Sequence, residues 1–278
     1  MGAKERFDLS GLIALVTGGS RGIGRGIALG LAEHGAEVAI VFNRAREAAD
    51  EVAQQIRSQG RQAWVYQQDL AETEKLGNLA DTICRDAGKV DILVNNAGLG
   101  YLEAFNKIGP ETWRRTMAVN LDAAFFLTQR IAEHMIAQKI KGRVIHVSSV
   151  NGYCAEGGLA HYNASKGALE LMSKSFAIEL GAHGITSNTI CPGIIETEIG
   201  EDFELAPGFN DYFKQHIPLE HHFGNVEDCV GAVIFLASRA GAYMTGQRLV
   251  LDGGVSCDQV PRMQFMPPYE NTMKSPSR

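Results

Sequence analysis

The chain has 278 residues, of which 45% are hydrophobic and 21% are charged, and this balance excludes a disordered protein. Its formal net charge of −6 gives no positive field that could hold nucleic acid, so no nucleic-acid partner is expected. No apolar run approaches the ~20 residues that a membrane-spanning helix requires, and no membrane partner is expected.

The first residues carry charges without an apolar stretch behind them, so a secretory signal is not expected. The 5 cysteines include no CxxC pair and leave one unmatched, which favours reduced thiols and a cytoplasmic location. Cys84, Cys191 and Cys229 have apolar neighbours and are expected to be buried. The histidines of the polar stretch 216–222 lack a ligand spacing, so no metal site is predicted.

Short apolar runs alternate with amphipathic stretches along the chain. The apolar runs are expected to be strands, at residues 12–16, 38–42, 63–66, 92–94, 144–147, 185–190 and 248–251. The stretches between them predict helices at residues 25–34, 45–58, 73–86, 111–138 and 162–180. Continuous apolar runs separated by helices indicate a parallel sheet that is covered on both faces. The sequence therefore predicts a doubly wound α/β domain with a seven-stranded parallel sheet over residues 1–254.

Two segments interrupt this alternation. Residues 196–227 form a long polar segment with several acidic and aromatic side chains, and an insertion of this kind is expected to be a substrate lid. Residues 255–278 form a C-terminal extension that is expected to be partly flexible, although 260–269 is too apolar for a purely solvated tail.

A glycine-rich turn, Thr17-Gly18-Gly19-Ser20-Arg21-Gly22-Ile23-Gly24, follows the first predicted strand and leads directly into a helix. Glycines let the backbone turn sharply and let a phosphate approach the amides at a helix N-terminus. The spacing differs from GxGxxG, which would need a glycine where Ile27 stands. A plain tight turn would also explain this segment if it stood alone.

Further polar residues occur in matching strand, loop and helix contexts. Asn95-Asn96-Ala97-Gly98 follows the fourth predicted strand, Asn120 lies inside the fourth helix, and Ser149 ends the fifth strand. Tyr162 and Lys166 are four residues apart, so they project from one face of a helix. The ordered set is not expected by chance.

This set resembles the classical short-chain dehydrogenase/reductase family over about residues 8–254. The glycine-rich turn, Asp69, NNAG, Asn120, Ser149, YNASK and Cys191-Pro192-Gly193-x-x-x-Thr197 all occur in the family's order. The resemblance implies a Rossmann-like fold and hydride transfer between a nicotinamide cofactor and a secondary alcohol or ketone. Residues 192–197 and 243–247 are most similar to the 3-oxoacyl-carrier-protein reductase branch.

The resemblance implies four catalytic residues, Asn120, Ser149, Tyr162 and Lys166. Tyr162 would transfer the proton while Ser149 holds the substrate oxygen, and the positive charge of Lys166 would lower the pKa of Tyr162. Lys166 would also bind the nicotinamide ribose, and Asn120 would anchor a water, with a helix kink or local cap as its alternative. The residues expected to bind the cofactor are Gly18, Ser20, Arg21, Gly22, Ile23, Gly24, Asn43, Arg44, Asp69, Leu70, Asn96, Ala97, Gly98, Tyr162, Lys166, Pro192, Gly193, Ile195 and Thr197.

The end of the second predicted strand bears on the choice of cofactor. An NAD-selective enzyme places a carboxylate there, but the position is occupied by Phe42. Arg21 and Arg44 could instead meet the 2′-phosphate of NADP, with Asn43 as a further donor. The sequence therefore predicts a preference for NADP(H), with NAD(H) as an alternative. Asp69 is expected either to contact the adenine ring or to cap the helix that follows it.

Several functions fit the motifs. The favoured one is an enzyme that acts on a free small-molecule ketone or alcohol, and a nucleotide-sensing regulator is the alternative without turnover. An acyl-carrier-protein reductase is disfavoured because Ile140 and His183 stand where that branch has two docking arginines, and because the lid is acidic. The resemblance also implies a homotetramer, or a homodimer, that pairs the helices predicted at 111–138 and 162–180.

Overall fold

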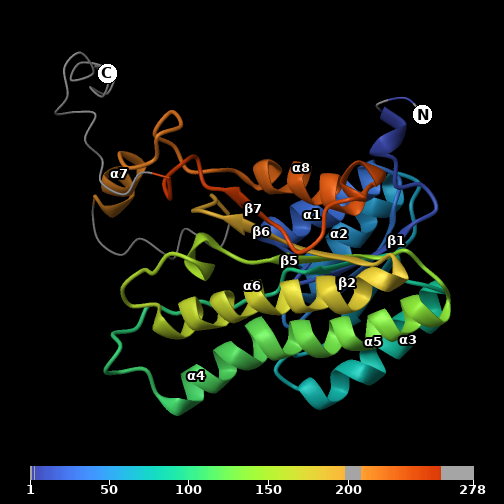
Figure 1. Cartoon of the computed structure of the whole chain (residues 1–278), viewed down its shortest axis with the longest axis horizontal. Coiled ribbons are helices and arrows are strands. Elements are labelled where there is room, and N and C mark those ends of the chain that lie inside the picture. The colour runs from blue at the N-terminus through green and yellow to red at the C-terminus, as the bar shows by residue number, and fades with distance from the viewer. Residues whose placement is uncertain (1, 3, 198–207, 258–278) are drawn as a thin grey trace.

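A seven-stranded, all-parallel sheet forms the centre of the molecule (Figure 1). The computed structural model describes residues 2, 4–197 and 208–257. Residues 198–207 of the predicted lid and 258–278 of the predicted C-terminal extension therefore lie outside the described residues.

The strands are ordered β3-β2-β1-β4-β5-β6-β7, as predicted for a doubly wound Rossmann-like sheet. Their bounds are β1 Ile13–Thr17, β2 Glu37–Phe42, β3 Ala63–Gln67, β4 Ile92–Asn95, β5 Arg143–Val147, β6 Thr186–Pro192 and β7 Arg248–Leu251. All seven predicted strands are confirmed, with ends that move by at most two residues. The chain order reverses between β1 and β4, which opens a crevice at the carboxyl ends of these strands.

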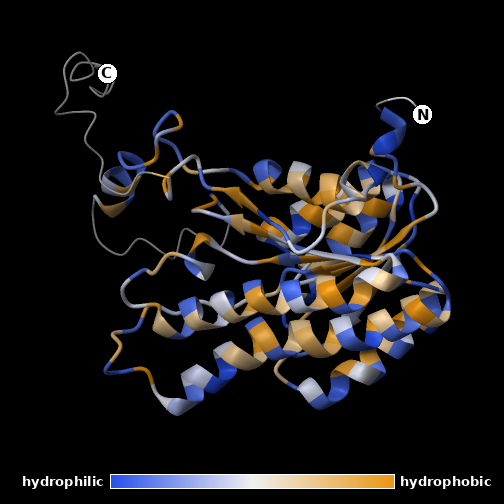
Figure 2. Ribbon diagram, in the orientation of Figure 1, coloured by the Kyte–Doolittle hydropathy of each residue, from blue (hydrophilic) through white to orange (hydrophobic). Residues whose placement is uncertain are grey.

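Helices cover both faces of the sheet (Figure 1). On one face lie α1 (Gly22–Glu33), α2 (Arg46–Ser58) and α8 (Val226–Ala237), whose buried residues join one core cluster. On the other face lie α3 (Leu76–Ala87), α5 (Ala123–Ala137) and α6 (Ala160–Leu180). Figure 2 shows hydrophobic strands between helices whose outer sides are hydrophilic. No helix in the described ranges is long and apolar enough to span a membrane.

Three helix predictions need correction. α1 begins at Gly22 rather than at residue 25, so the end of the glycine-rich turn forms the start of the helix. The helix predicted at 73–86 begins as a 3-10 turn, Thr73–Lys75, before α3. The single helix predicted at 111–138 is divided into α4 (Pro110–Met117), a π-helical turn (Ala118–Asp122) and α5. Two helices were not predicted, α7 (Phe209–Lys214) and α8.

Candidate active site

The loop between β1 and α1 has the backbone that an anion site needs. Gly18 and Gly22 have φ angles of +65° and +54°, a region that favours glycine. A Cβ on Gly24 would clash with the carbonyl oxygen of Gly18, so glycine lets the helix approach the loop closely. Arg21 at the N-cap provides no side-chain hydrogen bond to the first amides of α1. These amides can therefore receive the pyrophosphate of a dinucleotide.

The Asn95-Asn96-Ala97-Gly98 loop ties the end of β4 to the end of β1. The hydroxyl of Thr17 accepts hydrogen bonds from the amides of Asn96, at 3.0 Å, and Ala97, at 3.1 Å. The Asn96 side chain donates to the carbonyl of Thr17 at 2.9 Å. A Cβ on Gly98 would lie 3.4 Å from Lys166 Nζ, so this loop also borders the expected catalytic residues.

Asn120 lies in the π-helical turn, is 2% exposed and joins three segments. Its Oδ1 accepts from the amide of Leu99 at 2.7 Å, and its Nδ2 donates to the carbonyl of Leu99 at 2.9 Å. Nδ2 also donates to the hydroxyl of Ser165 on α6 at 3.0 Å. The helix irregularity that was the alternative for Asn120 is thus present, and the water-binding role stays a prediction.

Ser149, Tyr162 and Lys166 converge beyond the carboxyl end of β5. Ser149 caps a 3-10 turn and accepts a hydrogen bond from the amide of Asn151 at 3.2 Å. Tyr162 lies in the first turn of α6, and Lys166 follows one turn later with its Nζ 5.5 Å from the centroid of the tyrosine ring. Lys166 Nζ donates to the carbonyl of Val147 at 2.8 Å.

The loop after β4 packs onto this group. A Cβ on Gly100 would lie 3.5 Å from the ring of Tyr162, so the loop backbone runs directly beside that ring. Tyr101 stacks on the fully buried ring of His161, with 6.3 Å between the ring centroids. The backbone at Gly100 therefore covers part of the Tyr162 ring.

Burial has the largest effect on the pKa values of Tyr162 and Lys166. It raises the pKa of Tyr162 above the ordinary value, although a hydrogen bond from the Ser149 side chain acts in the opposite direction. Burial also lowers the pKa of Lys166 to about 8. Loss of hydration thus has the largest effect on the pKa of Tyr162 in the chain alone. The expected lowering of this pKa by Lys166 together with the positive nicotinamide of the oxidised cofactor stays a prediction.

A buried carboxylate that sequence reasoning missed lies behind Lys166. Glu170, one helical turn later and 8% exposed, accepts hydrogen bonds from the thiol of Cys191 at 3.0 Å and the hydroxyl of Thr189 at 3.1 Å. Its negative charge raises the pKa of Lys166 and partly opposes the effect of burial. The position of an acid four residues after Lys166 was the available signal. The predicted burial of all three cysteines is confirmed.

We expect Lys166→Met to stabilise the protein while it abolishes turnover. The pKa of Lys166 falls from 10.5 to about 8 on folding, so the unfolded chain binds more protons between these pH values and stability rises with pH across this window. Near pH ~7 Lys166 is protonated, and folding removes its ammonium group from water. Replacing this group by an apolar one should therefore raise the free energy of unfolding by about 1–3 kcal/mol.

Thermal unfolding at fixed protein concentration would measure this difference. The difference in stability between Lys166→Met and wild type should decrease as the pH approaches ~10, where wild-type Lys166 is largely neutral. Lys174→Met, an exposed substitution on the same helix, is the control and should change stability little. A Lys166→Met variant that is less stable than wild type near neutral pH would contradict this interpretation.

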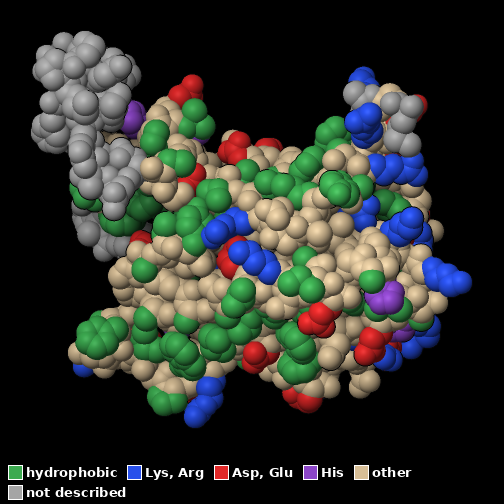
Figure 3. Space-filling view, viewed as in Figure 1, with side chains coloured by type: hydrophobic (Ala, Val, Ile, Leu, Met, Phe, Trp, Pro, Cys, Tyr) green, Lys and Arg blue, Asp and Glu red, His purple; other side chains and the backbone are tan. Residues whose placement is uncertain are grey.

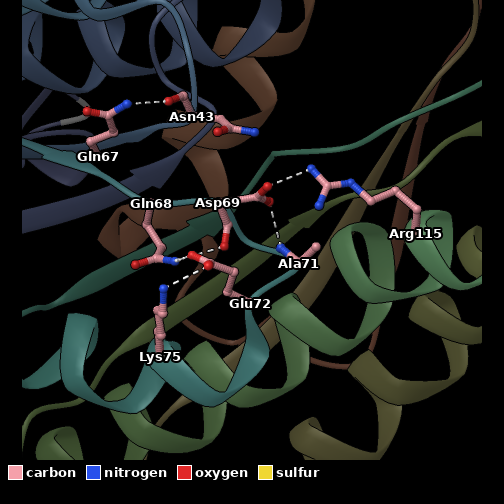
Figure 4. Close-up of polar contacts among 8 residues, drawn as sticks. All are labelled: Asn43, Gln67, Gln68, Asp69, Ala71, Glu72, Lys75 and Arg115. Carbon is pink, nitrogen blue, oxygen red and sulfur yellow. Dashed lines mark hydrogen bonds and ion pairs between the residues drawn. The ribbon is translucent and has the colours of Figure 1, made fainter.

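The predicted 2′-phosphate contacts surround the end of β2. Phe42 is the last residue of this strand and is 2% exposed, so no carboxylate occupies that position. Asn43 and Arg44 directly follow it and are exposed. Arg21 is exposed in the loop after β1, where the amides of Gly18 and Gly19 donate to the carbonyl of Val41 in β2. The carbonyl of Asn43 accepts a hydrogen bond from Gln67 Nε2 at 2.9 Å, which fixes the backbone here (Figure 4).

Asp69 and Leu70 follow β3 at the adenine side of the crevice. Asp69 forms an ion pair with Arg115 of α4 at 2.9 Å and accepts from the amide of Ala71 at 3.0 Å (Figure 4). Burial would raise the pKa of Asp69, but these two hydrogen bonds bring it below the ordinary value. Asp69 therefore stabilises its own loop and does not cap the helix that follows, where Glu72 and Lys75 are the N-cap residues of the 3-10 turn and of α3; the adenine contact stays a prediction. Sequence reasoning missed Arg115, which no motif marked.

Residues after β6 lead to the predicted lid. The amide of Gly193 donates to the carbonyl of Leu251 at 3.0 Å, and Ile195 forms an isolated parallel bridge with Gly224. Pro192 ends β6, and Thr197 is the last residue of this segment that the structure describes. This segment thus reaches past the sheet at the same edge as Ser149.

A dinucleotide-type crevice beside a convergent serine, tyrosine and lysine defines the class as a nicotinamide-dependent oxidoreductase. Residues 18–256 match a family model described as enoyl-(acyl carrier protein) reductase. The chain belongs to the short-chain dehydrogenase/reductase family, as predicted, and it is a dehydrogenase/reductase that acts on CH–OH groups with NAD(P).

Named relatives cover nearly the whole chain. Gluconate 5-dehydrogenase of Gluconobacter oxydans is 36% identical over 92% of this chain and 99% of its own length. A 3-oxoacyl-[acyl-carrier-protein] reductase of Synechocystis is 35% identical over 89% of this chain and 98% of its own. The crystal structure of a gluconate 5-dehydrogenase from Burkholderia cenocepacia, in complex with NADP and tartrate, has a TM-score of 0.87 at 36% identity and covers 92% of this chain and 100% of its own.

Proposed function

We propose that this enzyme interconverts a secondary alcohol and a ketone on a free small molecule and prefers NADP(H) to NAD(H). The convergence of Ser149, Tyr162 and Lys166 carries this proposal. The bound nicotinamide would supply or accept the hydride. The glycine-rich loop and the free amides of α1 would hold its pyrophosphate, and Arg21 and Arg44 would meet the 2′-phosphate.

The chain's own part in the reaction is the movement of a proton. During reduction, Ser149 donates a hydrogen bond to the substrate carbonyl oxygen and Tyr162 gives that oxygen its proton. During oxidation, Tyr162 accepts the proton from the alcohol. Because its pKa is raised, Tyr162 is protonated and has a proton to give, and the ammonium of Lys166 would favour the phenolate that remains.

An acyl-carrier-protein reductase is the alternative, since one named relative has that activity. Ile140 and His183, where the family's docking arginines would stand, offer no fixed positive charge to an acidic carrier protein. Lys139, Lys141 and Arg143 leave some positive charge nearby, but a small free substrate is better supported. Buried thiols are in keeping with a cytoplasmic location.

A homotetramer, or a homodimer, is part of the proposal. Large hydrophobic side chains on α5 and α6 remain exposed in one chain: Phe125 is 37%, Phe126 42%, Leu171 68% and Ile178 82% exposed. Figure 3 shows hydrophobic side chains gathered over these helices. We expect light scattering to give about two or four times the 30.1 kDa mass of one chain. A monomer at micromolar concentration would contradict this expectation.

Turnover assays would test the proposed activity. The enzyme is mixed with NADPH and a panel of small cyclic, steroid and sugar-derived ketones, or with NADP⁺ and the matching alcohols, and the absorbance of the reduced cofactor is followed. A 3-oxoacyl thioester is included as the alternative substrate. Turnover of a free ketone is expected. Turnover of the thioester alone would favour the carrier-protein reductase, and tight cofactor binding without any turnover would favour a sensor.

A further inference from the structure

A short segment on the substrate side of Ser149 carries a fixed carboxylate. Asn151 Nδ2 donates to Glu156 Oε2 at 3.4 Å and to Asn163 Oδ1 at 3.0 Å. The Asn163 side chain donates in turn to the backbone carbonyl of Glu156 at 3.0 Å. Two asparagines therefore hold both the backbone and the side chain of Glu156.

These asparagines connect Glu156 to the reacting group. The amide of Asn151 donates to Ser149 Oγ at 3.2 Å, and Asn163 directly follows Tyr162 on α6. The carboxylate of Glu156 is close enough that its negative charge raises the pKa of Tyr162. Glu156 is itself exposed, so it borders the open side of the site, where a substrate must enter.

The loop after β4 closes onto the same rim. The amide of Glu103 donates to the carbonyl of Gly158 at 2.8 Å, which joins this loop to the segment that holds Glu156. The two loops are thereby held together beside the site. A substrate at Tyr162 would thus meet the negative charge of Glu156.

A carboxylate in this position distinguishes between substrates by their charge and by their hydrogen-bonding groups. It only accepts hydrogen bonds, so it suits the hydroxyl groups of a sugar or polyol. It repels a carboxylate on the substrate, and for two exposed charges ~6 Å apart the effect on binding is about 3- to 30-fold in moderate salt.

We propose that Glu156 makes this enzyme select a neutral, polyhydroxylated alcohol or ketone over a sugar acid. The inference rests on the proposed function and names the substrate class of the same site. It separates this chain from the gluconate 5-dehydrogenases that it resembles, whose names specify an acid as substrate.

Matched substrates that differ in one carboxylate would test the proposal. We would measure kcat/KM with NADP⁺ for gluconate and glucitol, galactonate and galactitol, and mannonate and mannitol. The wild-type enzyme should prefer the neutral member of its best pair by about 3- to 30-fold, and added salt should weaken the preference. Glu156→Gln keeps the size and the contact with Asn151 while it removes the charge. It should raise kcat/KM for the acid about 3- to 30-fold and leave the neutral member within about threefold.

Glu51→Gln, an exposed substitution on α2, is the control and should leave the preference unchanged. A wild-type preference for the sugar acid, or a Glu156→Gln variant with the wild-type preference, would overturn the proposal. Turnover of small ketones with none of the six polyhydroxylated compounds would also overturn it, while leaving the proposed function intact. Absence of turnover with every alcohol and ketone would instead contradict the proposed function itself.

Discussion

Replacing Tyr162 by phenylalanine should lower turnover by ~10²–10⁴-fold while cofactor binding stays nearly unchanged. The substitution removes only the hydroxyl that would carry the proton and leaves the ring beside Gly100 and Lys166 in place. The fall should appear in kcat rather than in KM, because the proton moves only as the substrate reaches the transition state. Steady-state kinetics with the best ketone and a fluorescence titration with NADPH would measure the two quantities.

Tyr243→Phe is the matched control, since Tyr243 is fully exposed and far along the chain from the site. It should retain wild-type turnover. A Tyr162→Phe enzyme with wild-type kcat would show that another group donates the proton. If Tyr162→Phe lost cofactor binding as well, the tyrosine would have a positioning role that the geometry does not indicate.

The second large effect concerns cofactor choice, and we expect kcat/KM to be higher with NADP(H) than with NAD(H) by roughly 10- to 100-fold. A charged hydrogen bond to phosphate contributes ~1.5–3 kcal/mol, which corresponds to that range for one good contact. Phe42 provides no carboxylate to repel a 2′-phosphate, Arg44 is exposed just after it, and Arg21 is exposed in the glycine-rich loop. Arg44→Ala and Arg21→Ala should each lower the NADP(H) value ~10-fold and leave the NAD(H) value nearly unchanged.

Arg85→Ala on α3 is the control, because this exposed arginine pairs only with its neighbour Asp86 among the contacts described. The ratio of kcat/KM for the two cofactors should stay at the wild-type value. A wild-type enzyme that is faster with NAD(H) would reverse the assignment. Equal losses with both cofactors in Arg44→Ala would mean that the arginine supports the loop rather than the phosphate.

The strands could be predicted almost to the residue because a parallel sheet buries both of its faces. In β1 every residue from Ile13 to Thr17 is buried, so the sequence there is a continuous apolar run that needs no periodicity to be recognised. The order of the polar motifs then located the crevice, because the carboxyl ends of parallel strands meet at one edge.

Helix ends and interruptions were harder to predict. The π-helical turn around Asn120 follows from its two hydrogen bonds to Leu99, a contact between distant segments that helical periodicity does not reveal. α8 is mostly apolar and has no clear polar face, but the reciprocal hydrogen bonds of Asn225 and Asp228 at its start form a capping box that the sequence did contain.

The motifs predicted which residues gather at the site but not what surrounds them. Glu156, Glu170 and Arg115 belong to no motif and acquire their meaning from neighbours more than ten residues away or on another element. The effects of Glu156 on the pKa of Tyr162, of Glu170 on that of Lys166 and of Arg115 on that of Asp69 depend on burial and distance, which spacing alone does not give. These residues affect the pKa values of the site residues and do not determine the type of reaction.

The most direct test of the central claim is isotope transfer. The enzyme is incubated with NADPH that is fully deuterated at the nicotinamide C4 and with the ketone that it reduces fastest, and the product is analysed by mass spectrometry. We predict that the wild type forms an alcohol with one deuterium at the former carbonyl carbon. The Tyr162→Phe variant should form this alcohol only at the limit of detection. An alcohol without deuterium, or equal product from the two enzymes, would contradict hydride transfer with Tyr162 as the proton donor.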